Sequence, residues 1–293
     1  MGKISYKIKG HESFTIRDGW LTKGLSAVDK DNRLFKTNAG ADALGVGTNM
    51  AKSIRYWLRA ANLVTDSSSK GVSLTDMGRA VFENDPYLED LFSLWIIHIN
   101  IAANISLATS WNLFFNDLGI RSLFTREDLF ELMKAALTEY TGEQDLSVRS
   151  IRDDCGVLLQ MYSGKSGKND DPEEKKTSPF ESLGLISRIG GRYTKKRPPV
   201  DLIDPLVILY MIVDELNAHG SMQIDHVVDG RDMPGKLLNL NRIVVNGYLD
   251  DLQNQKMITV ERTAGLDIIY PAECMGYDRT KIIREYFERK TRA

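Results

Sequence analysis

Cysteine is scarce in this sequence. The only two, Cys155 and Cys274, lie far apart, and neither has a second cysteine nearby. Disulfide frameworks and zinc ribbons both need closely spaced cysteine pairs, so the sequence argues against these two classes and favours a reducing, cytoplasmic environment. The first fourteen residues also lack the apolar centre of a secretory signal peptide.

The sequence contains no clean apolar run of membrane-spanning length. The most apolar stretch, residues 88–107, includes Glu89, Asp90 and His98. These polar groups predict a buried helix of a soluble fold, in which His98 is a hydrogen-bonded core residue, and not a membrane span. Net charge is also small, with 38 Lys and Arg against 40 Asp and Glu. A protein that coats nucleic acid indiscriminately would be strongly basic, so only local basic surfaces remain possible.

One stretch breaks the globular pattern. Residues 163–178 read SGKSGKNDDPEEKKTS, with no apolar residue and many charges. Such a composition is typical of a flexible linker or exposed loop. We therefore expect an N-terminal domain over residues 1–162, a charged linker over 163–178, and a C-terminal domain over 179–293.

The N-terminal domain carries the pattern of a winged helix-turn-helix. A short helix ends near residue 44, a Gly-Val-Gly turn follows, and a longer helix is predicted over 49–61. Residues 63–74 resemble a hairpin with a polar turn, and Thr75 is placed to cap the next helix. Helix, tight turn, basic helix and hairpin in this order describe a DNA-binding winged helix.

The remaining segments predict a helical core and a second module of the same kind. Residues 86–140 and 147–162 are strongly helical in pattern, and a buried helix follows over 204–219. Two helices over 233–254 precede a hairpin formed by residues 257–260 and 266–270. The predicted fold is mainly α with short β-hairpins, in which two winged-helix-like modules are joined by a helical core.

Basic side chains on the predicted helices could contact DNA. Lys52, Arg55 and Arg59 share one side of their helix at positions i, i+3 and i+7, where they could meet phosphates beside a major groove. A solvated helix face is the alternative, and the preceding turn and following hairpin favour DNA contact. In the second module, Arg262 beside the hairpin turn is the residue expected to touch the DNA backbone.

The segment from Gly10 to Gly24 concentrates ionisable groups. Arg17 and Lys23 could neutralise charge that develops on a phosphodiester, while His11 or Glu12 handles protons or a metal. The alternative is a structural cap anchored by aromatic residues, and from the residues alone this alternative is favoured.

Asp154 lies at the margin of an apolar helical stripe, where a carboxylate needs a partner. A magnesium ion held by one or two carboxylates, water and phosphate would supply one. A hydrogen bond to a neighbouring helix end is the other explanation and is slightly favoured. The sequence shows no P-loop, GxSxG elbow, HExxH motif or paired-cysteine metal site.

Three stretches together resemble a known family. They are GHESFTIRDGWLTKG from residue 10, LGVGTNMAKSIRYWLRAANLV from residue 44 with SLTDMG from residue 73, and IRDDCGVLLQMY from residue 151. They are similar to the SspB-type DNA nickase family of single-strand DNA phosphorothioation systems, encoded beside reductase-like sulfur-transfer enzymes. The carried-over positions are His11, Glu12, Arg17, Trp20, Lys23, Asn49, Lys52, Arg55, Trp57, Asp154 and Tyr162.

The resemblance implies a magnesium-dependent enzyme that nicks double-stranded DNA so that sulfur can be inserted, together with a cysteine desulfurase and two ATP-using partners. On this hypothesis Asp154, with Glu12 as a possible partner, binds Mg²⁺, and Asn49, Lys52, Arg55 and Arg59 hold the duplex. A non-catalytic DNA-binding adaptor or transcription regulator is the alternative. A scaffold that only recruits sulfur-transfer enzymes is the third possibility.

Overall fold

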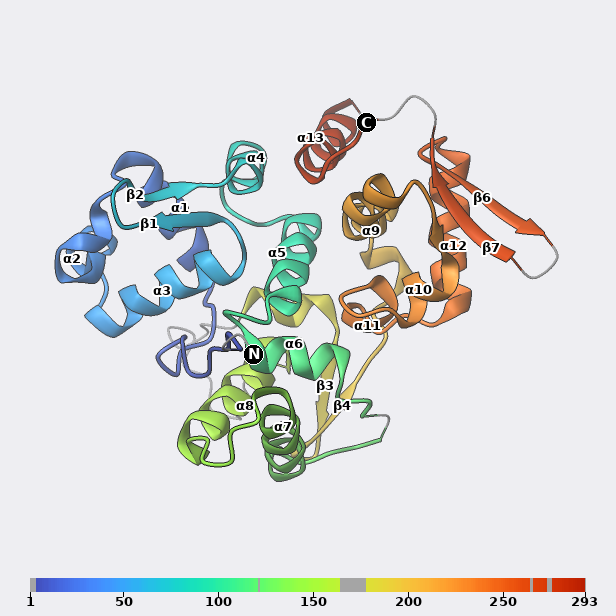
Figure 1. The fold of residues 1–293 in the computed structure, drawn as a ribbon. Coiled ribbons are helices and arrows are strands. Elements are labelled where there is room, and N and C mark those ends of the chain that lie inside the picture. The colour runs from blue at the N-terminus through green and yellow to red at the C-terminus, as the bar shows by residue number, and fades with distance from the viewer. Residues whose placement is uncertain (1–3, 121, 164–177, 264–265, 273–275, 293) are drawn as a thin grey trace. The chain divides into compact units, whose positions relative to one another are not determined.

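The computed structural model describes residues 4–120, 122–163, 178–263, 266–272 and 276–292. The chain forms two compact units, residues 1–196 and 197–293. Both are mainly helical with small antiparallel sheets (Figure 1), which confirms the predicted fold class at that level. None of the helices in these described ranges is long and apolar enough to cross a membrane.

The first unit begins with helices and a hairpin and continues as a helical bundle. The elements are α1 (Trp20–Lys30), α2 (Ala41–Leu44), α3 (Thr48–Ala60), β1 (Val64–Ser67), β2 (Gly71–Leu74), α4 (Asp76–Asn84), α5 (Leu91–Ala103), α6 (Thr109–Asn116), α7 (Arg126–Thr141), α8 (Val148–Ser163), β3 (Ile186–Ile189) and β4 (Arg192–Lys195). Short 3-10 turns lie at Leu34–Lys36, Asn38–Gly40 and Pro179–Leu183. Strand β1 pairs with β2, and β3 pairs with β4, each antiparallel.

Local signals in the sequence account for α3, the β1–β2 hairpin and α4. Helix α3 buries Ile54, Trp57 and Leu58 on one side, as their helical spacing predicts. The Thr75 side chain accepts a hydrogen bond from the Gly78 N–H at 2.9 Å and so caps α4 as predicted. A Cβ at Gly78 would lie 1.9 Å from the Leu63 carbonyl oxygen, so glycine lets the hairpin and α4 meet.

The bundle of the first unit is built around α5, which is buried along nearly its whole length. His98 in α5 has no exposed surface, and its Nδ1 lies 2.8 Å from the Tyr162 hydroxyl of α8. This contact confirms the prediction of a satisfied core histidine. In contrast, Val148 at the start of α8 is apolar but 46% exposed.

The first unit extends further along the chain than the predicted N-terminal domain. The Phe180 ring packs 6.1 Å from the Tyr162 ring, and Tyr193 of β4 forms a backbone bridge with Phe124. Residues 179–195 therefore complete the first bundle, and the boundary between the units follows Lys196 and not the 163–178 segment. Residues 164–177 of the predicted linker lie outside the described residues.

The second unit consists of a short 3-10 turn (Val200–Leu202), α9 (Pro205–His219), β5 (Met222–Gln223), α10 (Ile224–Asp229), α11 (Pro234–Leu237), α12 (Arg242–Asn254), β6 (Ile258–Thr263), β7 (Leu266–Pro271) and α13 (Arg279–Arg292). Its three strands follow the antiparallel order β5-β7-β6. Helix α12 packs on α9 and buries Val245, Leu249 and Leu252. Helices α1 and α13 were not predicted.

Candidate functional site

The first and third sequence motifs meet at Asp154, in the middle of α8. Its Oδ1 accepts hydrogen bonds from the Lys9 backbone N–H and from His11 Nε2, both at 2.8 Å. Its Oδ2 accepts from the Ser110 hydroxyl at 2.5 Å. His11 and Asp154 are 0% and 1% exposed. The structure therefore brings two predicted catalytic residues together across 143 positions, but it encloses both of them.

Both nitrogens of the His11 ring are occupied. Nδ1 accepts a hydrogen bond from the Ser13 backbone N–H at 3.1 Å, so the ring proton sits on Nε2 and is donated to Asp154. The Trp57 ring is stacked 5.8 Å away at 10°, and the Trp111 ring meets His11 edge-on at 5.5 Å. In this geometry His11 has no lone pair free for a metal or for a substrate proton.

The hydrogen bonds of Asp154 with Lys9 and His11 hold a loop in an uncommon backbone conformation. Lys9, Glu12 and Ser13 have φ values of 59°, 49° and 64°, in the left-handed region that non-glycine residues rarely adopt. Asp153 adds two contacts to this loop, one with Lys9 Nζ at 2.9 Å and one with the Ser13 hydroxyl at 3.1 Å. We call residues 9–14 the clamped loop, because adjacent carboxylates of α8 hold it at both ends.

The groups packed beside Asp154 are neutral at physiological pH. Burial, and then the charge of Asp154, raise the pKa of the Tyr56 hydroxyl well above its usual value. The same two causes lead the shift that raises the pKa of the Cys155 thiol to about 12. Neither the Tyr56 hydroxyl nor the Cys155 thiol is therefore ionised enough to serve as a nucleophile.

The predicted magnesium site does not fit the residues that surround it. Both oxygens of Asp154 accept hydrogen bonds from protein donors, and its neighbour His11 uses both ring nitrogens. Glu12 is partly buried, one residue along the clamped loop. Within the described ranges, no three His, Cys, Asp or Glu side chains gather closely enough to hold a metal ion. These hydrogen bonds do not support Asp154 as a metal ligand, and that assignment stays a prediction.

Arg17 and Lys23 lie around Trp20 at the start of α1. The Arg17 guanidinium stacks over the Trp20 ring at 5.1 Å and over the Phe14 ring at 5.7 Å. The Phe14 carbonyl in turn accepts a hydrogen bond from Trp57 Nε1 at 3.1 Å. Lys23 is exposed one helical turn beyond Trp20. The aromatic anchoring that the sequence offered as the alternative is present, and Arg17 and Lys23 remain closer to solvent than His11.

The exposed side of α3 carries most of the predicted DNA-binding residues. Asn49, Lys52 and Arg59 are exposed along it. Arg55 is different: its Nε and Nη2 bond Asp66 of β1 at 3.0 and 2.5 Å, and its guanidinium lies 5.3 Å from the Phe35 ring. Arg59 Nε also lies 3.8 Å from Asp66. Arg55 therefore ties the hairpin to α3, and Lys52 and Arg59 are the better-placed cations for a phosphate.

Arg262 lies at the end of β6, where its guanidinium pairs with Asp250 of α12 at 2.7 Å. Arg242 at the start of α12 is similarly placed between Asp225 and Asp267. Arg242 and Arg262 thus both have acidic partners within the second unit. The turn at residues 264–265 lies outside the described residues, and DNA contact by Arg262 stays a prediction.

Comparison with known proteins places the chain in a family. A family model described as "Protein of unknown function (DUF4007)" matches residues 8–287. The chain belongs to the DUF4007 family. Two solved structures resemble this DUF4007 protein, "Magnesium ion-bound SspB crystal structure" and "SspB crystal structure". Each has a TM-score of 0.82 and 22% sequence identity, and covers 97% of this chain and 87% of its own.

The likeness to the two SspB structures confirms the predicted resemblance at the level of the fold. No match to a curated protein was found. The resemblance rested on long local motifs, and the two that carry His11 and Asp154 are joined in the structure.

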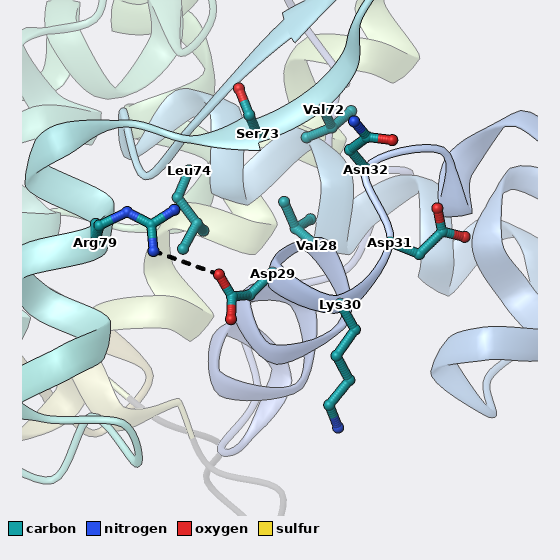
Figure 2. A pocket seen from close by; sticks show the side chains of 9 residues that line it. All are labelled: Val28, Asp29, Lys30, Asp31, Asn32, Val72, Ser73, Leu74 and Arg79. Atoms are coloured by element: carbon teal, nitrogen blue, oxygen red, sulfur yellow. Dashed lines mark hydrogen bonds and ion pairs between the residues drawn. The ribbon is translucent and has the colours of Figure 1, made fainter.

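The DUF4007 protein also has a pocket of about 370 Å³ where the β1–β2 hairpin meets the end of α1 (Figure 2). Asp29 and Arg79 face each other across it at 3.5 Å, and Val28 and Val72 contribute apolar surface. A Cβ at Gly71 would lie 2.2 Å from the Asn32 carbonyl oxygen, so glycine is required where the hairpin is tied to α1. None of the predicted site residues lines this pocket, although two of its lining residues, Ser73 and Leu74, begin the SLTDMG motif.

Proposed function

We propose that this DUF4007 protein binds duplex DNA through α3 and nicks one strand as part of a phosphorothioation system. The observation that carries the proposal is the exposed face of α3, with Asn49, Lys52 and Arg59, placed between a tight turn and the β1–β2 hairpin. We interpret α1 to β2 as a winged helix, whose third helix enters the major groove. The chain order α9-β5-α10-α12-β6-β7 with sheet order β5-β7-β6 supports a second winged helix.

The likeness to SspB supports the choice of system. One of the two related structures is titled as a magnesium-bound SspB. The family resemblance implies nicking of DNA before sulfur insertion, and it implies a cysteine desulfurase and two ATP-using proteins as partners. We extend these properties to the present chain as part of the proposal.

The chemistry that we assign uses the residues around the clamped loop. Arg17 and Lys23 stabilise the charge that develops on the phosphodiester, and Glu12 handles a proton. His11 and Asp154 act as positioning residues, because they fix the backbone on which Glu12 lies. Since the described donors around Asp154 do not fit magnesium, no step is assigned to a metal there.

The test is conversion of supercoiled plasmid to open circles by the purified protein, in magnesium and in excess chelator. The expected result is nicking by the wild-type protein in magnesium. Arg17→Ala should slow it by roughly a hundredfold or more, because a guanidinium that meets developing charge is lost. Arg33→Ala, which removes an exposed arginine of the same unit, should nick at the wild-type rate. Absence of open circles from wild-type protein under both conditions would refute the nicking activity.

A non-catalytic DNA-binding adaptor or transcription regulator is the second candidate. It is favoured by the enclosure of His11 and Asp154, whose hydrogen-bonding atoms are all engaged within the protein. An electrophoretic shift of duplex DNA by a protein that leaves plasmid intact would support this candidate over the nickase.

A further inference from the structure

The β3–β4 hairpin ends in a bare, tightly turned tip. Gly190 and Gly191 both have positive φ, 57° and 80°, which is the requirement of a two-residue type I′ turn. Ile189 pairs with Arg192 across this turn, and all four tip residues are exposed. A Cβ at either glycine would meet nothing within 4 Å. The glycines therefore serve the turn itself, and they leave the backbone at the tip open to close approach.

The tip combines an exposed apolar side chain with cations. Ile189 is 70% exposed, and Arg188 and Arg192 flank it. Residues 182–196 contain four Lys or Arg and no Asp or Glu. One carboxylate from another element, Asp128 of α7, interacts electrostatically with Arg192. Hydrogen bonds from Thr125 lower the pKa of Asp128 most, and the positive charge of Arg192 lowers it further. Because Asp128 is engaged in the N-terminal cap of α7, the hairpin keeps a surplus of positive charge.

The base of the hairpin is firmly held. Phe124 and Tyr193 exchange two backbone hydrogen bonds of 2.9 and 2.8 Å. Lys195 Nζ donates to the carbonyls of Phe114 and Leu118 at 3.0 and 3.3 Å. The Arg188 guanidinium lies 5.4 Å from the Tyr193 ring. The strands that support the tip are thus fixed at their base, so the hairpin loses less conformational entropy when the tip binds a ligand.

We propose that this hairpin is a wedge for duplex DNA: Ile189 inserts between base pairs from the minor groove, while Arg188 and Arg192 hold the flanking phosphates. Proteins that kink DNA from the minor groove use isoleucine and similar apolar side chains in this way, beside arginine and lysine. A surplus of cations without carboxylates favours a polyanion over a protein surface. The inference rests on the proposed DNA binding and adds how the duplex is opened at the strand to be cut.

The experiment measures unstacked thymines by permanganate oxidation of a long linear duplex saturated with the full-length protein. Wild-type protein should raise thymine reactivity above that of free DNA, and Ile189→Ser should remove most of the increase while still binding. Ile189→Leu should retain it. Val200→Ser is the matched control, because Val200 is 52% exposed and its 3-10 turn precedes α9, outside both segments interpreted as winged helices. The control should behave as wild type.

A second measurement follows affinity against salt for Arg188→Ala/Arg192→Ala. Loss of two phosphate contacts should flatten the slope of log K against log salt by about 2 units. Unchanged thymine reactivity in Ile189→Ser at full binding overturns the wedge and leaves the proposed function standing. An unchanged salt slope in the double variant removes the phosphate contacts and also overturns it. Failure of the wild-type protein to bind duplex overturns both proposals.

Discussion

At the scale of single residues, Asp154 shows how a buried carboxylate can hold a loop in place. It is enclosed, it accepts three hydrogen bonds, and two of its donors belong to the clamped loop. The burial of this carboxyl group is tolerated because each oxygen accepts a hydrogen bond from the protein. The sequence indicates that Asp154 needs a partner, and the structure supplies hydrogen-bond donors from the same chain, among them His11.

We expect Asp154→Ala to lower the free energy of unfolding by about 3–5 kcal/mol, since removing one member of a buried pair leaves the other members without partners. Urea unfolding followed by circular dichroism measures this. Asp145→Asn, at an exposed carboxylate of the same unit, is the control and should unfold as wild type. Wild-type stability in Asp154→Ala would show that the clamp contributes nothing. A loss of nicking in this variant has meaning only beside that measurement.

The raised pKa of the Tyr248 hydroxyl predicts that the stability of the protein falls at alkaline pH. Burial, and then the nearby carboxylates Asp201, Asp251 and Asp204, raise the pKa of its hydroxyl from 10.0 to about 12. The native state holds this proton more tightly than the unfolded chain, so the stability it contributes is complete below pH 10 and falls as the pH rises from 10 through 12. Tyr248→Phe should lose less stability over this window than wild type, as urea unfolding at stepped pH would show. The same loss in both proteins would contradict the assignment.

At the scale of elements, α3 and the β1–β2 hairpin are joined by side-chain contacts. Arg55 joins them through Asp66, so the hairpin is held at a fixed angle to the exposed face of the helix. This ion pair could not be foreseen, because periodicity places Arg55 on the outer side of α3 but does not say what the returning strand will present. The sequence suggests that Arg55 is available for DNA, but in the structure its guanidinium is hydrogen-bonded to Asp66.

The salt dependence of DNA binding tests this division of roles. Lys52→Ala/Arg59→Ala should flatten the slope of log K against log salt by roughly 2 units, because each lost phosphate contact contributes about 0.9. Arg55→Ala should change the slope less and lower thermal stability, since Asp66 loses its closest partner. Lys30→Ala/Arg33→Ala, at two exposed cations outside α3, should match wild type. Equal slopes in the α3 variant and wild type would show that α3 does not face DNA.

At the scale of the whole molecule, the chain is organised as two units that each bury their own core. The second unit packs α9 against α12 and the three-stranded sheet, with side chains such as Tyr210, Ile212, Leu249 and Ile269 fully enclosed. A core of this kind supports independent folding, although a unit of this size buries a smaller share of its surface than a large domain.

Residues 197–293 expressed alone should therefore unfold in a single cooperative thermal transition, with the helical circular dichroism expected of α9, α12 and α13. A fragment beginning at residue 179 should show no gain in melting temperature, because residues 179–195 belong to the first unit. A broad, non-cooperative transition of the 197–293 fragment would contradict the division of the chain after Lys196.

Local physics explains what could be predicted. The limits of α3, the Thr75 cap of α4 and both major hairpins follow from periodicity, capping and turn residues, whose causes lie within a few positions along the chain. Helices α1 and α13 were not predicted, because ionisable residues precede and interrupt α1 and make up most of α13. Family membership was also available from the motifs, since they are long.

Only tertiary structure decided the rest. The pairing of His11 with Asp154, the capture of Arg55 by Asp66 and the placement of residues 179–195 in the first unit join segments that are separated along the chain. Whether a carboxylate binds a metal, a substrate or its own fold depends on which donors the packing brings within 3 Å of it. Sequence spacing carries no record of those donors, so it identified the residues that matter and left their roles to the fold.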